Sequence, residues 1–219
     1  MLFEQITEIL DPEPHSAPLN MALDEALLQR ATMPTLRIYG WCRRAVSLGY
    51  FGRFEEAEQM AGEREMVRRW TGGGLVEHGD DITYTLIVPR ETPFFQQTPL
   101  ESYRLIHQRI APWLSERDIP AGVAPLSAEK SSGACFASHV RYDIVGGGIK
   151  LAGAAQRRTR WGLLHQGSIQ IRSARSDTTD LARIFAARIQ QTSVTEDLLQ
   201  LAGEIAQQRY ARDEWLRKF

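Results

Sequence analysis

Three consecutive glycines, residues 72–74, stand between two segments with the pattern of β-strands. Glycine adopts positive φ without steric cost, so this stretch predicts a tight turn whose backbone can approach a ligand closely. Arg68 and Arg69 precede the turn, and their charge, together with the backbone N–H groups, would suit an anion. The segment is not a Walker loop, because no Gly-Lys-Ser/Thr follows. A bare triglycine is more often a flexible hairpin turn, but these flanking residues favour a binding role.

The order of strand-like and helix-like segments indicates the fold class. The strands come in runs joined by short turns instead of alternating strictly with helices, which favours an α+β (α/β) fold. We expect a large mixed, mostly antiparallel sheet flanked by helices, with the helices on one face. The expected strands cover residues 3–9, 35–39, 45–49, 66–70, 75–78, 82–88, 141–145, 149–155 and 163–171. The expected helices cover residues 20–28, 54–61, 98–118, 178–190 and 196–217.

Two of the expected helices begin with a capping signature. Thr98 is followed by Pro99 and then by Glu101, which together predict a helix start at this point. Ser193 and Glu196 have the same spacing and predict the start of the last helix.

Charge and cysteine content exclude several classes of protein. The 26 basic and 27 acidic side chains nearly cancel, so no overall field attracts nucleic acid or a membrane. The N-terminal residues lack the regions of a signal peptide, and no apolar run approaches the length of a membrane span. Two cysteines are too few for a disulfide framework or a cysteine zinc cluster, so we expect a cytoplasmic, reduced protein. Local basic clusters at 43–44, 68–69 and 157–160 favour an anionic small ligand or an acidic partner.

Cys135 and Lys150 are the candidate reactive residues. Cys135 follows small residues that leave a thiol accessible, and a nearby cation would raise its thiolate fraction. Lys150 begins a strand of small residues that includes Gly153 and Ala155. A long, thin apolar ligand, or a lysine-bearing loop of another protein, would fit against such a strand. From residue chemistry alone, a structural thiol and a solvent-exposed lysine are equally open interpretations.

His78 follows the glycine turn and could act as a base, as a donor to a ligand or as an ordinary strand-end histidine. No second histidine or carboxylate stands at a metal-ligand spacing from it, so we expect no metal site.

Six motifs occur in order along roughly residues 20–171. They are Asn20-Met21-Ala22-Leu23-Asp24-Glu25-Ala26, Arg68-Arg69-x-Thr71-Gly72-Gly73-Gly74-x-Val76-x-His78, Asp81-x-Thr83-Tyr84, Tyr142-Asp143-Ile144, Lys150-x-x-Gly153-x-Ala155-Gln156 and Leu164-x-Gln166-Gly167-Ser168-Ile169. Together they resemble the lipoate/octanoate branch of the biotin–lipoate protein ligase superfamily.

The resemblance implies roles for these motifs. In that family the arginine–glycine turn and the lysine strand bind the acyl group or its adenylate, and the family's lysine corresponds to Lys150. The implied substrate-binding residues are Arg68, Arg69, Thr71, Gly72, Gly73, Gly74, His78, Gly153, Ala155 and Gln156. We also expect one catalytic domain over residues 1–219, without the C-terminal accessory domain that many ligases carry.

Two chemistries occur on this fold. Octanoyltransferases take octanoate from acyl carrier protein through a cysteine thioester, without ATP, and residues 134–136 are similar to their cysteine-bearing loop. Lipoate ligases activate free lipoate with ATP and Mg, and the uninterrupted glycine run is similar to theirs. Either enzyme would modify a lipoyl-domain protein, such as the glycine cleavage H protein or a 2-oxoacid dehydrogenase subunit. A non-catalytic module that binds lipoate is a third interpretation.

We expect the transferase, with Cys135 and Lys150 as its catalytic pair. The thiolate would attack an octanoyl or lipoyl thioester, and the lysine would stabilise the thiolate or shuttle a proton from the incoming amine. This route requires both side chains to face each other across one apolar slot beside the glycine turn.

Overall fold

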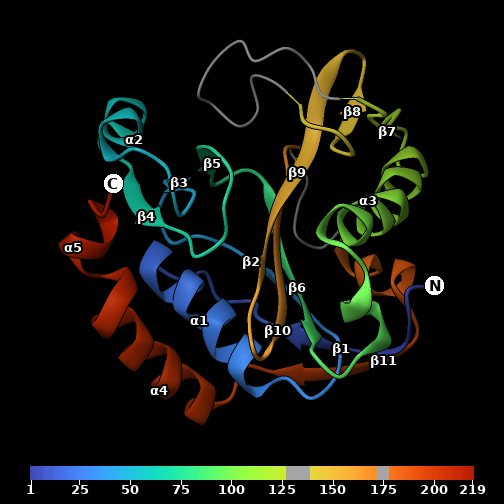
Figure 1. The fold of residues 1–219 in the computed structure, drawn as a ribbon, viewed down its shortest axis with the longest axis horizontal. Helices are drawn as coiled ribbons and strands as arrows, with labels where there is room; N and C mark the ends of the chain where they lie inside the picture. Colours follow the sequence, from blue (N-terminus) through green and yellow to red (C-terminus); the bar gives the residue numbers. More distant parts are fainter. Residues whose placement is uncertain (127–138, 172–177) are drawn as a thin grey trace.

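The structure is a computed structural model that describes residues 1–126, 139–171 and 178–219. Eight strands of these residues form the main sheet, in the order β11-β1-β2-β6-β10-β9-β8-β7 (Figure 1). Their bounds are β1 Phe3–Leu10, β2 Thr35–Tyr39, β6 Ile82–Pro89, β7 Gly122–Val123, β8 Ile144–Gly146, β9 Ile149–Arg158, β10 Gly162–Ile169 and β11 Ala186–Ser193. β1 pairs in parallel with β2 and β11, and the other neighbours pair antiparallel, which confirms the expected mixed sheet.

Helices cover both faces of this sheet, so the expectation of a single covered face is wrong. α1 (Ala17–Arg30) and α4 (Glu196–Ile205) lie on one face, and α3 (Pro99–Ser115) lies on the other (Figure 1). On β6, Leu86 packs in the apolar cluster that contains α3, whereas its neighbour Ile87 packs with α1. Every residue of β6 and β10 is buried, which is typical of strands covered on both faces.

The segment 178–190, expected to be one helix, instead passes through turns and a short 3-10 helix and ends in a strand. A short 3-10 helix, Leu181–Ile184, leads into β11, which pairs with β1 from Phe3↔Ala186 to Leu10↔Ser193. Its alanine, arginine and glutamine residues favour a helix locally, but pairing with β1 overrides that propensity. The sequence lacks the alternation of apolar and polar residues that predicts a strand, because β11 lies at the sheet edge and most of its side chains are exposed.

The C-terminal helix also differs from the expectation. α4 begins after Thr195, whose hydroxyl accepts a hydrogen bond from Leu198 N, so the predicted Ser193 capping box is wrong. A π-helical turn, Ala206–Tyr210, and the short α5, Asp213–Leu216, replace the second half of the expected helix. Thr98 caps α3 as predicted, and its hydroxyl accepts from Glu101 N.

Most of the remaining expected elements agree with the structure to within a few residues. α2 covers Phe54–Ala61, as predicted. β8 begins only at Ile144 because Tyr142 has a φ of 72° and stands in a turn, so the expected strand over 141–145 is mostly wrong.

A three-stranded sheet carries the glycine turn. In the described part of the chain its order is β4-β3-β5, with β3 (Ala45–Leu48) between β4 (Glu65–Arg68) and β5 (Val76–His78). The glycine turn is therefore not a hairpin: it crosses the end of β3, because β4 and β5 lie on opposite sides of that strand. The crossing is close, since a Cβ at Gly49 would lie 2.0 Å from the carbonyl oxygen of Gly73. Gly73 has a φ of 87°, which favours glycine.

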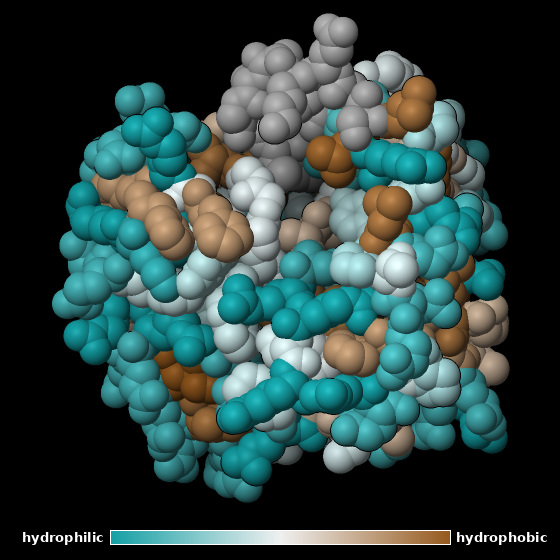
Figure 2. All heavy atoms as spheres, in the orientation of Figure 1, coloured by the Kyte–Doolittle hydropathy of each residue, from teal (hydrophilic) through white to brown (hydrophobic). Residues whose placement is uncertain are grey.

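The surface in the view of Figure 2 is largely hydrophilic, with apolar side chains in small separate groups. Within the described ranges, no helix has both the length and the apolar character needed to cross a membrane.

Candidate functional site

A narrow pocket lies between the three-stranded sheet and one face of the main sheet. The space between its walls is about 450 Å³, part of which is open to solvent. The predicted site residues in its walls are Arg69, Gly73, His78, Lys150, Gly153 and Ala155. The other lining residues are Met21, Tyr39, Trp41, Ser47, Val76, Thr83, Ala154, Gln166, Gly167 and Ser168.

The floor of the pocket consists of cross-strand rows of small and polar residues. In one row Gly153 of β9 pairs with Ser168 of β10, which pairs with Thr83 of β6. In the next row on the same face, Ala155 pairs with Gln166. Because side chains alternate across a strand, the glycine and the alanine face the same side and add little side-chain bulk of their own to the floor.

Lys150 lies in the pocket wall beside Gly153. A Cβ at Gly153 would lie 2.5 Å from Cε and 2.7 Å from Nζ of the lysine, so only glycine leaves room for this side chain to fold across β9. Nζ lies 2.8 Å from Oδ2 of Asp143, and the two side chains are only 3% and 0% exposed. The lysine is therefore a buried, charge-compensated group and not a solvent-exposed one.

Arg69 holds the glycine turn in shape. Its guanidinium donates to the carbonyl oxygens of Gly72 and Gly74 at 2.8 and 2.9 Å. It also donates to the carbonyl and hydroxyl oxygens of Ser47 at 2.8 and 2.7 Å. These bonds fix the turn over the pocket, where Gly73 presents only its backbone to the interior.

His78 is held between a hydroxyl and a carboxylate. Nε2 lies 2.7 Å from Ser47 Oγ, and Nδ1 lies 3.0 Å from Asp81 Oδ2. The imidazole stacks on Trp41, with ring centroids 4.2 Å apart. Burial favours a higher pKa for Asp81, but His78 and the Ser168 hydroxyl outweigh it and hold this pKa below its usual value. Both nitrogens of His78 are engaged within the protein, so the side chain contributes an aromatic wall.

Two predicted site residues, Arg68 and Gln156, point away from the pocket. The Arg68 guanidinium is buried among carbonyl oxygens, including those of Gly52 and Leu216, each at 2.7 Å, and ties α5 to the three-stranded sheet. Gln156 faces α3, and its Nε2 lies 3.0 Å from His165 Nδ1. Strand alternation is the cause, since Arg69 and Ala155, their immediate neighbours, take the positions that face the pocket.

Cys135 lies among residues 127–138, outside the described residues, so its predicted pairing with Lys150 stays a prediction. In the ranges that the structure describes, no group of histidine, cysteine, aspartate and glutamate side chains could hold a metal ion.

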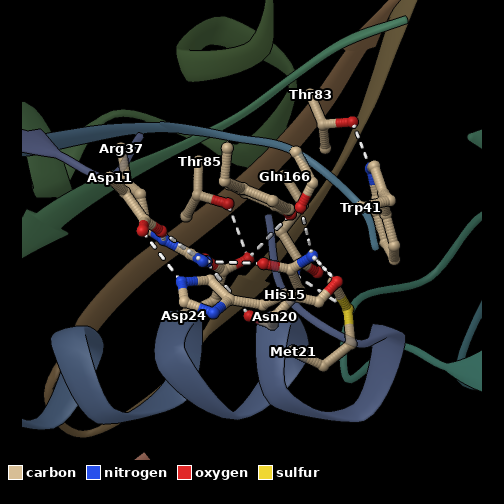
Figure 3. Close-up of polar contacts among 12 residues, drawn as sticks. Asp11, His15, Asn20, Met21, Asp24, Arg37, Trp41, Thr83, Thr85 and Gln166 are labelled. Carbon is tan, nitrogen blue, oxygen red and sulfur yellow. Dashed lines mark hydrogen bonds and ion pairs between the residues drawn. The ribbon is translucent and has the colours of Figure 1, made fainter. Parts of the chain in front are cut away.

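A buried polar network behind the pocket was not predicted from the sequence (Figure 3). Arg37 of β2 donates to Asp11 Oδ2 at 2.9 Å and to Asp24 Oδ1 at 2.8 Å. Burial favours a higher pKa for Asp11, but the hydrogen bond with His15 and the charge of Arg37 hold this pKa below its usual value. One signal was present in the sequence. Asn20 and Asp24 are polar residues one helical turn apart in a segment that is otherwise mostly apolar.

This network reaches the pocket through Gln166. The Nε2 of Gln166 donates to Asp24 Oδ2 at 2.7 Å, and its Oε1 accepts from the Thr71 hydroxyl at 2.7 Å (Figure 3 shows the first contact). Thr71, predicted as a substrate-binding residue, thus ties the glycine turn to the pocket floor. The amide of Gln166 is fixed in one orientation because donor and acceptor are both satisfied.

The chain matches a family model, the lipoyl protein ligase A/B catalytic domain, over residues 16–208. It is similar to octanoyltransferase LipM of Exiguobacterium sp., at 35% identity over 179 residues that cover 74% of this chain and 65% of that protein. The chain spans about two thirds of the length of the first curated relatives it matches.

Solved structures share the fold. A T. acidophilum protein with bound lipoic acid superposes with a TM-score of 0.78 at 20% identity, covering 99% of this chain and 100% of that one. A lipoate-protein ligase A bound with ATP superposes with a TM-score of 0.77 at 19% identity, covering 98% and 99%.

Proposed function

Because this chain belongs to the family of lipoyl protein ligase A/B catalytic domains, we propose that it transfers an octanoyl or lipoyl group to a lysine of a lipoyl domain. The observation that carries the proposal is the buried ammonium of Lys150 in the wall of a narrow pocket whose floor includes Gly153 and Ala155. The relative named octanoyltransferase supports acyl transfer as the reaction.

The pocket suits a thin acyl chain with its reactive carbonyl at one end. Gly153 and Ala155 form a flat floor, and Gly73 and Val76 lie opposite them. Lys150 supplies a positive charge beside Gly153, where an oxyanion would form during acyl transfer. The chain would extend from there along Ala155.

The proposed reaction has two half-reactions and needs no ATP. The Cys135 thiolate attacks the carbonyl of an octanoyl thioester on acyl carrier protein. A new C–S bond to Cys135 forms, the carrier's C–S bond breaks, and the carrier leaves as a thiolate that takes a proton from the solvent. The neutral amine of the lipoyl-domain lysine then attacks the enzyme thioester and forms an amide. The C–S bond to Cys135 breaks, Cys135 leaves as thiolate, and the proton of the amine passes to the solvent. Exchange of one thioester for another is nearly balanced, and conversion of a thioester to an amide is favourable.

Lys150 acts in this scheme as a fixed positive charge. Its ammonium has a buried carboxylate partner, Asp143, which compensates the cost of placing the charge in the protein interior. A charged ammonium stabilises both a thiolate and a developing oxyanion, so the geometry supports an electrostatic role over a proton shuttle.

The proposed donor is acyl carrier protein and the recipient is a lipoyl-domain protein, such as the glycine cleavage H protein or a 2-oxoacid dehydrogenase subunit. The reaction would take place in the cytoplasm, without a nucleic-acid or membrane partner.

The test mixes the protein with octanoyl-acyl carrier protein and a lipoyl domain in the absence of ATP. Intact-mass spectrometry should show an octanoylated enzyme when the lipoyl domain is omitted, and an octanoylated lipoyl domain when it is present. Cys135→Ser should abolish both products. Wild-type transfer by Cys135→Ser would contradict the covalent route.

The same variant separates transferase from ligase. Lipoate and MgATP are supplied in place of the carrier, and pyrophosphate release is measured. Release that survives Cys135→Ser would identify an ATP-dependent ligase. Lipoate binding without turnover in either assay would identify a binding module.

A further inference from the structure

We propose that Tyr103 of α3 is a positioning residue that aims the Asp143 carboxylate at Lys150. This inference rests on the proposed acyl transfer, because it assigns Tyr103 a role in holding the cation of that site.

Asp143 is fully buried and uses its two oxygens for different partners. Oδ2 lies 2.8 Å from the Lys150 ammonium and accepts from Val140 N at 2.7 Å. Oδ1 accepts a short hydrogen bond from the Tyr103 hydroxyl. A donor on Oδ1 prevents rotation of the carboxylate, so Oδ2 stays directed at the lysine.

The same hydroxyl holds the strand that carries the pocket floor. β8 pairs with β9 only as far as Ile144↔Ala152, so along this edge Ala154 N–H lies beyond the last described strand pair. Ala154 N–H instead donates to the Tyr103 hydroxyl at 3.0 Å. One oxygen therefore connects the carboxylate beneath Lys150 with the backbone that follows Gly153.

Tyr103 keeps its proton and stays a donor to Asp143. Burial and the negative charge of Asp143 raise the pKa of Tyr103 well above its usual value. Burial also raises the pKa of Tyr84, which faces the same layer from β6. Neither phenol therefore ionises near neutral pH, and neither adds negative charge beside Asp143.

The histidines around Tyr103 do not compete for the carboxylate. Among the described residues, His107 of α3 and His165 of β10 pack on the Tyr103 ring, with centroids 4.2 and 5.8 Å away. Burial lowers the pKa of His107 to about 4 and lowers that of His165 well below its usual value. Both are neutral near pH 7, so neither adds a positive charge that competes with Lys150 for Asp143.

The first experiment removes only the hydroxyl, with Tyr103→Phe. We expect kcat for acyl transfer to fall about tenfold, because a hydrogen bond to a charged group is lost. We also expect the alkaline limb of the pH–kcat profile to move to lower pH, because an ammonium with a misaligned counter-ion loses its proton more readily. KM for the acyl donor should change little, since Tyr103 does not line the pocket.

The matched control is Tyr84→Phe. The Tyr84 hydroxyl lies 3.1 Å from His165 Nε2, in the same buried layer, but does not bond to Asp143. This variant should lose stability to a similar extent while its pH–kcat profile stays unchanged. An equal shift of the alkaline limb in both variants would show a general packing effect and overturn the positioning role.

A second measurement does not depend on activity. Competitive acetylation with acetic anhydride as a function of pH, read by peptide mass spectrometry, reports the protonation of each lysine. In Tyr103→Phe the curve of Lys150 should move to lower pH, while that of the exposed Lys218 should stay in place. An unchanged Lys150 curve would refute the inference even if the wild type transfers acyl groups. A shifted curve in a protein without transferase activity would support the positioning while contradicting the proposed function.

Discussion

Gly153 lies directly beneath the amine of Lys150: a Cβ at this glycine would come within 2.7 Å of Nζ. The two residues stand three positions apart on β9, and the side chain of the first folds back over the backbone of the second. The Lys-x-x-Gly spacing is thus a packing requirement, because any side chain at the second position would displace the ammonium from Asp143.

Gly153→Ala should therefore impair catalysis more than stability. We expect kcat for acyl transfer to fall on the order of 10²-fold, since a displacement of about 1 Å in a reacting group has this effect. Gly122→Ala is the control, because a Cβ there meets nothing within 4 Å. Steady-state kinetics of both variants test this expectation, and equal rates for Gly153→Ala and the wild type would contradict it.

Asp24→Asn should strongly destabilise the fold. It removes one of the two carboxylates paired with Arg37, whose side chain is 0% exposed, and leaves Asp11 as the other. Removing one partner of a buried ion pair costs up to about 3–5 kcal/mol. Asp80→Asn is the matched control, because its ion pair with Arg44 is mostly exposed and contributes about 0–1 kcal/mol. Urea denaturation measures both free energies of unfolding. Similar losses in the two variants would show that the buried pair adds nothing.

The free energy of unfolding should fall as the pH drops below 6.5. Burial lowers the pKa of His107 from 6.5 to about 4. Between these two pH values the unfolded chain binds a proton at this residue and the folded protein does not. This contribution is complete above pH 6.5 and is lost as the pH falls towards 4, with a total on the order of 3 kcal/mol.

Urea denaturation between pH 7.5 and pH 4.5 tests this dependence against His107→Gln, a variant that keeps a donor for the Tyr142 carbonyl. The slope with pH should be smaller in the variant. Asp11 and Asp81 do not contribute to the slope in this pH range. Their pKa values are lowered from 3.8, so they change the free energy of unfolding only below about that pH. Identical slopes in both proteins would be evidence that another group is responsible.

Arg68→Lys should loosen the C-terminal segment. The guanidinium donates to carbonyl oxygens of Gly52 and Leu216, and an ammonium has neither the number of donors nor the planar geometry to replace it. We expect faster hydrogen exchange in α5 and a loss of about 1–3 kcal/mol from carbonyl groups left without donors. Arg217→Lys, at an exposed ion pair with Asp213, is the control and should leave exchange unchanged.

Sequence patterns predicted the elements that bring the pocket together, but not every residue that faces it. The glycine turn and the lysine strand were both identified, and Arg69, His78, Gly153 and Ala155 line one pocket. Arg68 and Gln156 carry equally suitable chemistry, but strand alternation turns them to the opposite side. A motif marks a segment, and the direction of each side chain depends on which face of the strand is covered.

Long-range pairing accounts for most of the remaining differences. β11 has a helix-favouring composition. It forms a strand because it pairs in parallel with β1, which lies at the other end of the chain. The network around Asp24 likewise assembles residues from α1, β2, β6 and β10, and no local pattern contains that information.

The roof of the pocket beside Gly73 is main chain, and it cannot be widened or narrowed by exchanging one side chain for another. If the protein binds an acyl chain as proposed, changes in the size of that chain would be accommodated at side chains, such as Ala155 or Thr83 in the floor or Val76 opposite it. Size selectivity in this fold would then change through side chains of the two sheets. The main chain of the glycine turn would keep its part of the pocket wall in the same place.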